Sequence, residues 1–286
     1  MTIAYKYCDR YGAAILDNCE LRVTPPNQFN DPFEFTPHMV CSDPQGYARL
    51  MLRSKDNLRT IYEGLARDGA FDGTFRDFRE WVQVEKAGVI EIAKRGMPLC
   101  LMNTQKEFVE RVSERFGLLC LSKRHDSILM WGHYTDKHRG LVIGFYTSLE
   151  VFRQGKGLRS VKYVRERVRY DATWKLGSVP LLRYEDEILL SKNADWEYEQ
   201  EQRQIFILST LKKKPLDDGT TGFFLPFSTD AVAQVILGAR CSSDLAKRAK
   251  ELVPSKFPKA QVLRASLHES QFTLTIAPVS GHLLRT

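Results

Sequence analysis

Short apolar runs of strand length recur from residue 117 to the end of the chain, and they constrain the fold more than any other feature. GLLCLS (117–122), GLVIGFY (140–146) and AVAQVILG (231–238) are bounded by polar or turn residues, as buried strands commonly are. Further strands are predicted at IAYKYC (3–8), ELRVT (20–24), VKYV (161–164), QRQIFIL (202–208), GFFLPF (222–227) and QFTLTIAPV (271–279). The pattern predicts a core built around a sheet.

Residues 44–116 instead follow a helical pattern. Apolar residues recur near helical spacing in 44–67 and again in 74–96. A third helix is predicted over 104–116, with Phe108 and Phe116 on one face. Short helices are also predicted at 127–134, capped by Ser127, and at 242–253, capped by a serine at its start. Helices and strands are segregated, so we predict one α+β domain over 1–286: a central, mostly antiparallel sheet with 44–116 as a helical insertion.

The chain carries a formal net charge of +7, which permits a polyanionic partner such as nucleic acid. The positive charge is concentrated in 159–170, predicted as one strand, in 209–216, predicted as a loop, and in the helix over 244–259. No stretch of about 18 apolar residues lacks a charge, and the N-terminus has no secretory pattern. We therefore expect a cytoplasmic protein with no membrane partner.

Several common chemistries have no motif in this chain. The Gly-rich phosphate loops, the nucleophile elbow and the HExxH zinc motif are all missing. His133 and His138 are five residues apart, which would place them on different faces of a helix, so no metal site is expected. Cys120, inside an apolar run, is predicted to be a core residue.

The first motif with chemical potential is FNDPFE at 29–34. Asp31 and Pro32 favour a tight turn anchored by phenylalanines, which is one interpretation. The other is that Asn30 and Asp31 face a ligand pocket beside the first two strands, because anchored loops often carry function.

The second motif is LMWGHYTDKHRG at 129–140. A hydrophobic core would explain Trp131 and Tyr134 but explains His133 less well. An aromatic platform beside hydrogen-bonding groups would suit stacking on a planar ring such as nicotinamide or adenine.

The third motif is WEYEQEQR at 196–203. If this segment already belongs to a strand, side chains two residues apart point to the same face. Glu197, Glu199, Glu201 and Arg203 would then share one face. Clustered carboxylates repel one another, so at least one could have a raised pKa. The cluster is either a solvated edge or a way to aim an acid at a substrate.

Together with the early YKY at 5–7 and with Lys192, these motifs resemble the bacterial family catalogued as domain of unknown function 2971, over roughly residues 3–240. That family is similar, more distantly, to ADP-ribosyltransferases of the toxin and phage-defence kind. The resemblance implies a three-part site: Tyr5 or Tyr7 on the first strand, Ser122 in the middle, and Glu199 or Glu201 late in the chain. It also implies NAD as a substrate and an antitoxin as a candidate partner protein.

The resemblance implies a role for each site residue. The second glutamate of Glu199-x-Glu201 would be catalytic and hold the ribose, while Glu199 would orient or deprotonate the acceptor. Ser122 would steady the site, and Trp131 or Tyr134 would stack on nicotinamide. Lys192 or Arg203 would pair with the pyrophosphate or order the glutamates. The basic segments would attract a nucleic-acid acceptor.

Three other functions stay open at this level. The chain could bind nucleotides or nucleic acid without catalysis. It could be a nuclease that holds magnesium with Asp31, Glu34, Glu199 and Glu201. It could also be a structural partner, such as one member of a toxin–antitoxin pair.

Overall fold

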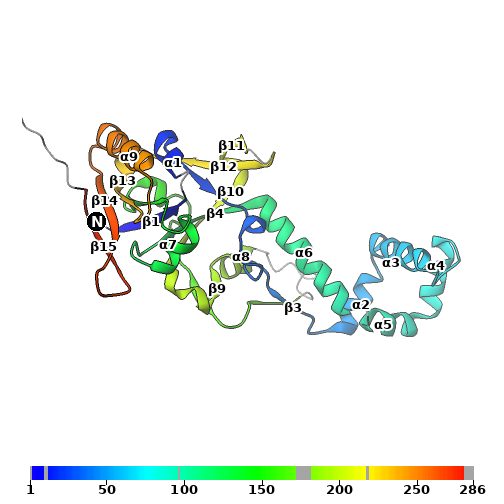
Figure 1. Cartoon of the computed structure of the whole chain (residues 1–286). Helices are drawn as coiled ribbons and strands as arrows, with labels where there is room; N and C mark the ends of the chain where they lie inside the picture. The colour runs from blue at the N-terminus through cyan, green and yellow to red at the C-terminus, as the bar shows by residue number, and fades with distance from the viewer. Residues whose placement is uncertain (1, 10–11, 96, 172–181, 217–218, 280–286) are drawn as a thin grey trace, which may run out of the picture. The chain divides into compact units, whose positions relative to one another are not determined.

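The computed structural model describes residues 2–9, 12–95, 97–171, 182–216 and 219–279 (Figure 1). The chain divides into two compact units. The first comprises Met1–Glu34, Val112–Glu166 and Leu189–Thr286, and the second comprises Phe35–Arg111 and Arg167–Ile188. We predicted one domain with an insertion over 44–116. The second unit holds most of that block and also the later segment 167–188, which the sequence did not connect with it.

The first unit is built on a large sheet, which confirms the α+β prediction. In the described part of the chain it has eight strands, in the order β15-β14-β13-β5-β1-β4-β10-β6. Every neighbouring pair is antiparallel except β13 and β14. The strands are β1 (Ile3–Cys8), β4 (Phe116–Ser122), β5 (Leu141–Tyr146), β6 (Arg159–Ser160), β10 (Glu201–Ile207), β13 (Val232–Leu237), β14 (Gln261–Leu267) and β15 (Leu274–Pro278). Of these, β14 was not predicted.

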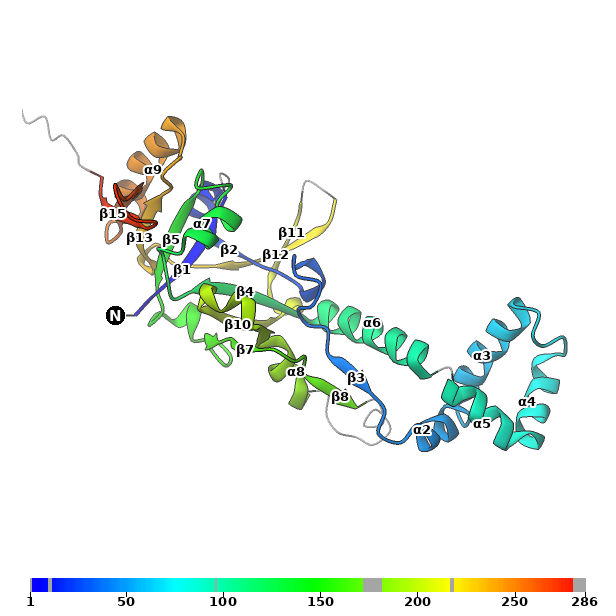
Figure 2. The same ribbon diagram turned by 60° about the horizontal axis from the view of Figure 1, so that its bottom comes forward.

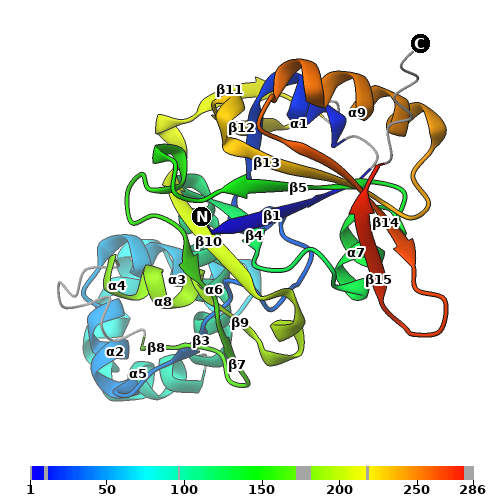
Figure 3. The ribbon, with the colours of Figure 1, turned by 90° about the vertical axis from the view of Figure 1, so that its left-hand side faces the viewer.

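The two faces of the sheet have different covers, because side chains alternate along each strand. On β1, Ala4 belongs to a core that packs against α1 (Ala13–Asn18) and α9 (Ser243–Lys256). Tyr5 and Tyr7 face the other side, where α7 (Ile128–Tyr134) packs. Figure 3 shows α1 and α9 on one side of the sheet and α7 on the other. The sequence also predicts one or two helical turns over residues 9–19; α1 lies within that range, and Arg10 and Tyr11 lie outside the described residues.

Both predicted serine caps are confirmed. The Ser127 hydroxyl accepts a hydrogen bond from the backbone N–H of Met130 at 3.4 Å, and the Ser242 hydroxyl accepts one from Leu245 at 3.2 Å. Each satisfies a backbone donor that the first turn of a helix leaves free. The cap at Ser127 fixes where α7 begins and therefore where Tyr134 lies.

Smaller sheets and short 3-10 helices complete the first unit. The smaller sheets are β11-β12-β2 and β7-β9, formed by β2 (Glu20–Val23), β11 (Lys212–Pro215), β12 (Thr221–Pro226), β7 (Lys162–Val164) and β9 (Ser191–Asn193). The 3-10 helices are η1 (Pro26–Gln28), η2 (Glu150–Phe152), η4 (Ala194–Glu199), η5 (Leu208–Thr210) and η6 (Thr229–Ala231).

Two predictions about the basic segments were wrong. Residues 212–215 are strand rather than loop, since they pair with β12 and two of the lysines there bind Glu20. Residues 159–170 are not one strand. β6 pairs with β10 and β7 pairs with β9, and the residues from Arg167 on belong to the second unit.

The second unit is mainly helical. Its elements are β3 (His38–Val40), α2 (Pro44–Met51), α3 (Lys55–Arg67), α4 (Phe75–Val84), α5 (Lys86–Arg95), α6 (Met97–Arg115), β8 (Arg169–Asp171) and α8 (Leu182–Leu189), with α6 and α8 ending in the first unit. In Figure 2, α3, α4 and α5 lie together, and they enclose a small core around Phe78. The predicted helix over 104–116 begins earlier, at Met97, and stops before Phe116, which starts β4 instead. No helix in the described ranges is long and apolar enough to cross a bilayer.

Candidate functional site

Three residues from distant parts of the chain form one row across the sheet. Tyr5 on β1 lies opposite Ser122 on β4, and Ser122 lies opposite Glu201 on β10. Directly paired residues of antiparallel strands point to the same face, so the three side chains share the face that carries α7. On the next strand the partner of Tyr5 is Gly144. A Cβ on Gly144 would stand only 3.1 Å from the Tyr5 ring, so glycine leaves room for that ring.

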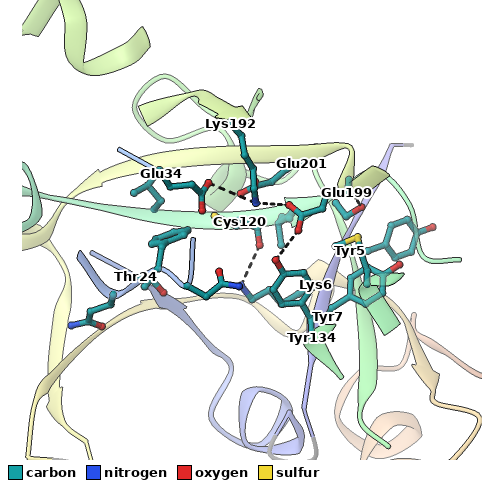
Figure 4. Close-up of a pocket in the computed structure, with 17 residues that line it drawn as sticks. Tyr5, Lys6, Tyr7, Thr24, Glu34, Cys120, Tyr134, Lys192, Glu199 and Glu201 are labelled. Atoms are coloured by element: carbon teal, nitrogen blue, oxygen red, sulfur yellow. Dashed lines mark hydrogen bonds and ion pairs between the residues drawn. The ribbon is translucent and has the colours of Figure 1, made fainter. Parts of the chain in front are cut away.

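Beside this row, two cations hold three carboxylates. The Lys192 ammonium lies 2.6 Å from Glu199 Oε2, 3.2 Å from Glu201 Oε2 and 3.7 Å from Glu34 Oε1. Figure 4 shows Glu34 and Glu199 approaching Lys192 from opposite sides. Lys192 is placed by the short parallel pair β7-β9, in which it lies opposite Tyr163.

Arg203 is the second cation. Its Nε and Nη2 donate to the two oxygens of Glu201 at 2.8 and 2.9 Å, a two-pronged contact that fixes the carboxylate plane. Its Nη2 also binds Glu34, and its Nη1 donates to the Leu189 carbonyl at 2.8 Å. Arg203 is 0% exposed. It therefore holds the carboxylates in place from inside the protein and does not itself face the cavity.

The network fixes the charge of Glu201. Burial alone would raise its pKa, but the positive charges of Arg203 and Lys192 outweigh burial and lower the pKa to about 2. For Glu34 burial prevails, and its pKa is raised. Burial would lower the pKa of Lys192, but the negative charges of Glu201, Glu34 and Glu199 outweigh burial and raise it. At neutral pH Glu201 is therefore a fixed anion.

A cavity of about 240 Å³ opens over this row and network. β1 contributes Tyr5, Lys6 and Tyr7, and α7 contributes Tyr134. The Tyr134 hydroxyl donates to Glu199 Oε1 at 2.7 Å, which ties α7 to the carboxylates. One oxygen of Glu34, Oε2, is buried and has no hydrogen-bond partner among the described residues. A buried acceptor without a partner is uncommon, and a ligand hydroxyl could supply the missing donor.

Eight of the residues predicted for the site line this cavity: Tyr5, Tyr7, Asn30, Ser122, Tyr134, Lys192, Glu199 and Glu201. They come from five separate segments of the chain, and the sheet register brings them together. Four predicted residues, Asp31, Trp131, His133 and Arg203, do not line it.

Trp131 is a core residue, contrary to the expected stacking role. It is 0% exposed, packs edge-on against Tyr7 at 5.7 Å between ring centroids, and donates from its indole N–H to the His125 carbonyl at 2.7 Å. Its ring is therefore not available to a ligand in this structure. Tyr134, one turn later on α7, lines the cavity in its place.

Asp31 and His133 also lie away from the cavity. The Asp31 carboxylate accepts a hydrogen bond from the Phe33 backbone N–H at 2.9 Å, which is the turn-forming interpretation of the motif. His133 is exposed on α7, with its ring 6.4 Å from that of Trp196. The expectation that Glu197 shares a strand face with Glu199, Glu201 and Arg203 was wrong. Residues 194–199 form η4, and β10 begins only at Glu201.

Sequence reasoning missed nine of the residues that line the cavity, and three of them, Lys6, Glu34 and Cys120, carry titratable side chains. Glu34 was considered only as a magnesium ligand. Lys6, between Tyr5 and Tyr7 on β1, also lines the cavity, and its ammonium donates to the Cys120 carbonyl at 3.2 Å. Cys120 was predicted to be in the core, but it is partly exposed in the cavity wall. The available signal was that Cys120 lies two residues before Ser122 on β4, so both side chains face the same side of the strand.

The described residues do not provide the magnesium site that the nuclease alternative requires. No group of three or more His, Cys, Asp or Glu within the described ranges is arranged to hold a metal ion. Asp31 is engaged in its own turn, and Lys192 and Arg203 stand where a cation between Glu34, Glu199 and Glu201 would have to go.

Glu201 is expected to make folding stability depend on acid pH. Its pKa in the folded chain, about 2, lies below its ordinary value of 4.5. Its contribution is therefore complete above pH 4.5 and is lost as the pH falls toward 2. In urea unfolding, the stability difference between the wild type and Glu201→Gln should shrink by about 3 kcal/mol between pH 6 and pH 2. A difference that stays constant with pH would show that Glu201 is not held as an anion.

No family model, no curated protein and no solved structure matches this chain.

Proposed function

We propose that this chain is an NAD-dependent ADP-ribosyltransferase that modifies nucleic acid, in a toxin or phage-defence role. The observation that carries the proposal is the row Tyr5–Ser122–Glu201, which ends on an anionic glutamate at a cavity. An aromatic residue on the first strand, a serine in the middle and a late glutamate are the three parts implied by the resemblance to ADP-ribosyltransferases.

The charge of Glu201 suits cleavage of the nicotinamide–ribose bond. When the bond between C1′ and the ring nitrogen breaks, its electron pair leaves with nicotinamide, and positive charge develops on the ribose, as in glycoside cleavage. A fixed anion beside the ribose stabilises that charge without reorganising during the reaction. Arg203 and Lys192 hold Glu201 in place for this role.

Glu199 is suited to the second half of the reaction. An acceptor hydroxyl or amine would attack C1′ and release a proton, which the Glu199 carboxylate would accept. Its two oxygens accept from Tyr134 and Lys192, and each carboxylate oxygen can accept a further hydrogen bond. The acceptor would therefore bind on the Tyr134 side of the cavity.

The cavity fits part of the substrate. Its volume of about 240 Å³ is below the roughly 300–1,000 Å³ of pockets that enclose a drug-sized ligand. It would therefore hold the nicotinamide and its ribose, with the rest of NAD outside. Tyr134 offers a ring for stacking, and Glu34 Oε2 offers an acceptor for a ribose hydroxyl.

Binding of carba-NAD, in which a cyclopentane replaces the nicotinamide ribose ring and prevents cleavage, tests this placement. We expect the wild type to bind it, and Tyr134→Ala to weaken binding on the order of tenfold through lost stacking. Isothermal titration calorimetry gives both affinities. Tyr146→Ala is the matched control, because Tyr146 lies on β5 and does not line the cavity. Absence of binding to the wild type, or equal affinity in Tyr134→Ala, would contradict the placement.

A further inference from the structure

The second unit has a cavity of its own, of about 350 Å³, formed by the helices around the Phe78 core. Its lining comes from α2, α3, α4, α5 and the segment between α2 and α3: Arg49, Leu52, Arg53, Leu58, Arg79, Val82, Gln83 and Lys86. No step of the proposed transfer reaction uses any of these residues.

The charged residues that line this cavity are all positive. Four of its eight lining residues are basic, none is acidic, and all four basic side chains are exposed. Within the part of the chain that the structure describes, none of the four forms an ion pair. Their neighbours differ: Arg76 on α4 binds Glu80, and Lys94 on α5 binds Glu91. The four cations are therefore available to an anionic ligand.

The floor of the cavity is apolar. Leu58 and Val82 are buried members of the core of this unit, and Leu52 packs against that core. A cationic rim around an apolar floor fits a ligand that carries both anionic groups and a flat apolar body.

We propose that this cavity binds single-stranded nucleic acid, with Arg49, Arg53, Arg79 and Lys86 on the phosphates and an unpaired base over the apolar floor. The guanidinium group of arginine presents paired N–H donors that match two phosphate oxygens. An unpaired base can enter a cavity that a base stacked in a duplex cannot reach. A carboxylate peptide would supply the charge but not the flat ring. As a statement about the acceptor, this inference rests on the proposed transferase function, whereas binding itself needs no NAD.

The basic segments noted in the sequence are less suited to this task. Lys212 and Lys214 both bind the buried Glu20, and Arg248 binds Asp17. These three cations are already compensated within the protein. The cations of the second unit come from separated positions that only helix packing brings together.

Fluorescence anisotropy of the full-length protein with a labelled single strand of about 16 nucleotides, as RNA and as DNA, tests the inference without NAD. The double variant Arg53→Gln/Arg79→Gln should bind on the order of tenfold more weakly. Its slope of log affinity against log salt should fall by about 1.4, because each lost phosphate contact removes about 0.7. The matched control Arg67→Gln/Arg76→Gln makes the same change in net charge at exposed residues that do not line the cavity. It should bind like the wild type.

Either single strand binding in this way supports the inference, and the tighter one names the acceptor class. Equal affinity in the cavity variant, an equal loss in the control, or tighter binding of a poly-glutamate peptide than of either strand would overturn it. Strand binding is measured without NAD. A failure of NAD cleavage alone would therefore count against the proposed function and leave the nucleic-acid site standing.

Discussion

Glu201→Gln is expected to slow nicotinamide release from NAD on the order of 10³-fold. The substitution keeps the size of the side chain and removes the negative charge beside the ribose. Arg203 and Lys192 would then face an amide, and the developing positive charge would lose its nearest fixed anion. The loss should fall on the turnover number more than on the Michaelis constant for NAD, because the charge develops only in the transition state.

Glu34→Gln is the matched control for this experiment. Glu34 is a buried carboxylate bound to the same two cations, Lys192 and Arg203. It does not belong to the Tyr5–Ser122–Glu201 row. It should retain activity to within about tenfold, since it contributes a ribose contact rather than the stabilising anion. If Glu34→Gln lost as much activity as Glu201→Gln, the network as a whole and not Glu201 would be required.

Arg203→Met is expected to lower the free energy of unfolding by about 3–5 kcal/mol. The guanidinium is fully buried and binds Glu34, Glu201 and the Leu189 carbonyl. Methionine fills part of the space but leaves two buried carboxylates with only Lys192 to compensate them. Removing one partner of a buried ionic network costs more than the network contributes, because the remaining charges stay desolvated.

Urea unfolding measures this loss, with two further variants for comparison. Arg203→Lys keeps the charge but not the two-pronged contact, so its stability should lie between the wild type and Arg203→Met. Arg22→Met removes an exposed arginine whose guanidinium donates to Gln28, and it should change stability by less than about 0.5 kcal/mol. An Arg203→Met protein as stable as Arg22→Met would mean that the carboxylates are not held as described.

The elements of the site could be predicted from sequence, but their register could not. β1, β4 and the start of β10 each have a local pattern of strand residues, and Tyr5, Ser122 and Glu201 were identified on them separately. Their alignment in one row depends on which strands are neighbours and in what register, and that is decided by packing between residues about 80 to 200 positions apart.

The misassigned residues have specific physical causes. Trp131 and Tyr134 lie on one short helix, and composition does not tell which of them turns toward the core. The alternation of glutamates before β10 resembled strand period, but Gln200 adopts a left-handed conformation, with φ of 45°, that ends η4 and starts the strand one residue later. The basic strand β11 has a loop-like sequence because Glu20, which compensates two of its lysines, is far away in the chain.

The central claim is tested most directly by incubating the wild type and Glu201→Gln with NAD labelled on the adenylate phosphate, together with total RNA, single-stranded DNA and cell protein. We predict label on nucleic acid, with equimolar release of nicotinamide, in the wild type and not in Glu201→Gln. Absence of both label and free nicotinamide in the wild type, or equal labelling by the two proteins, would contradict the assignment of this site to ADP-ribosyl transfer.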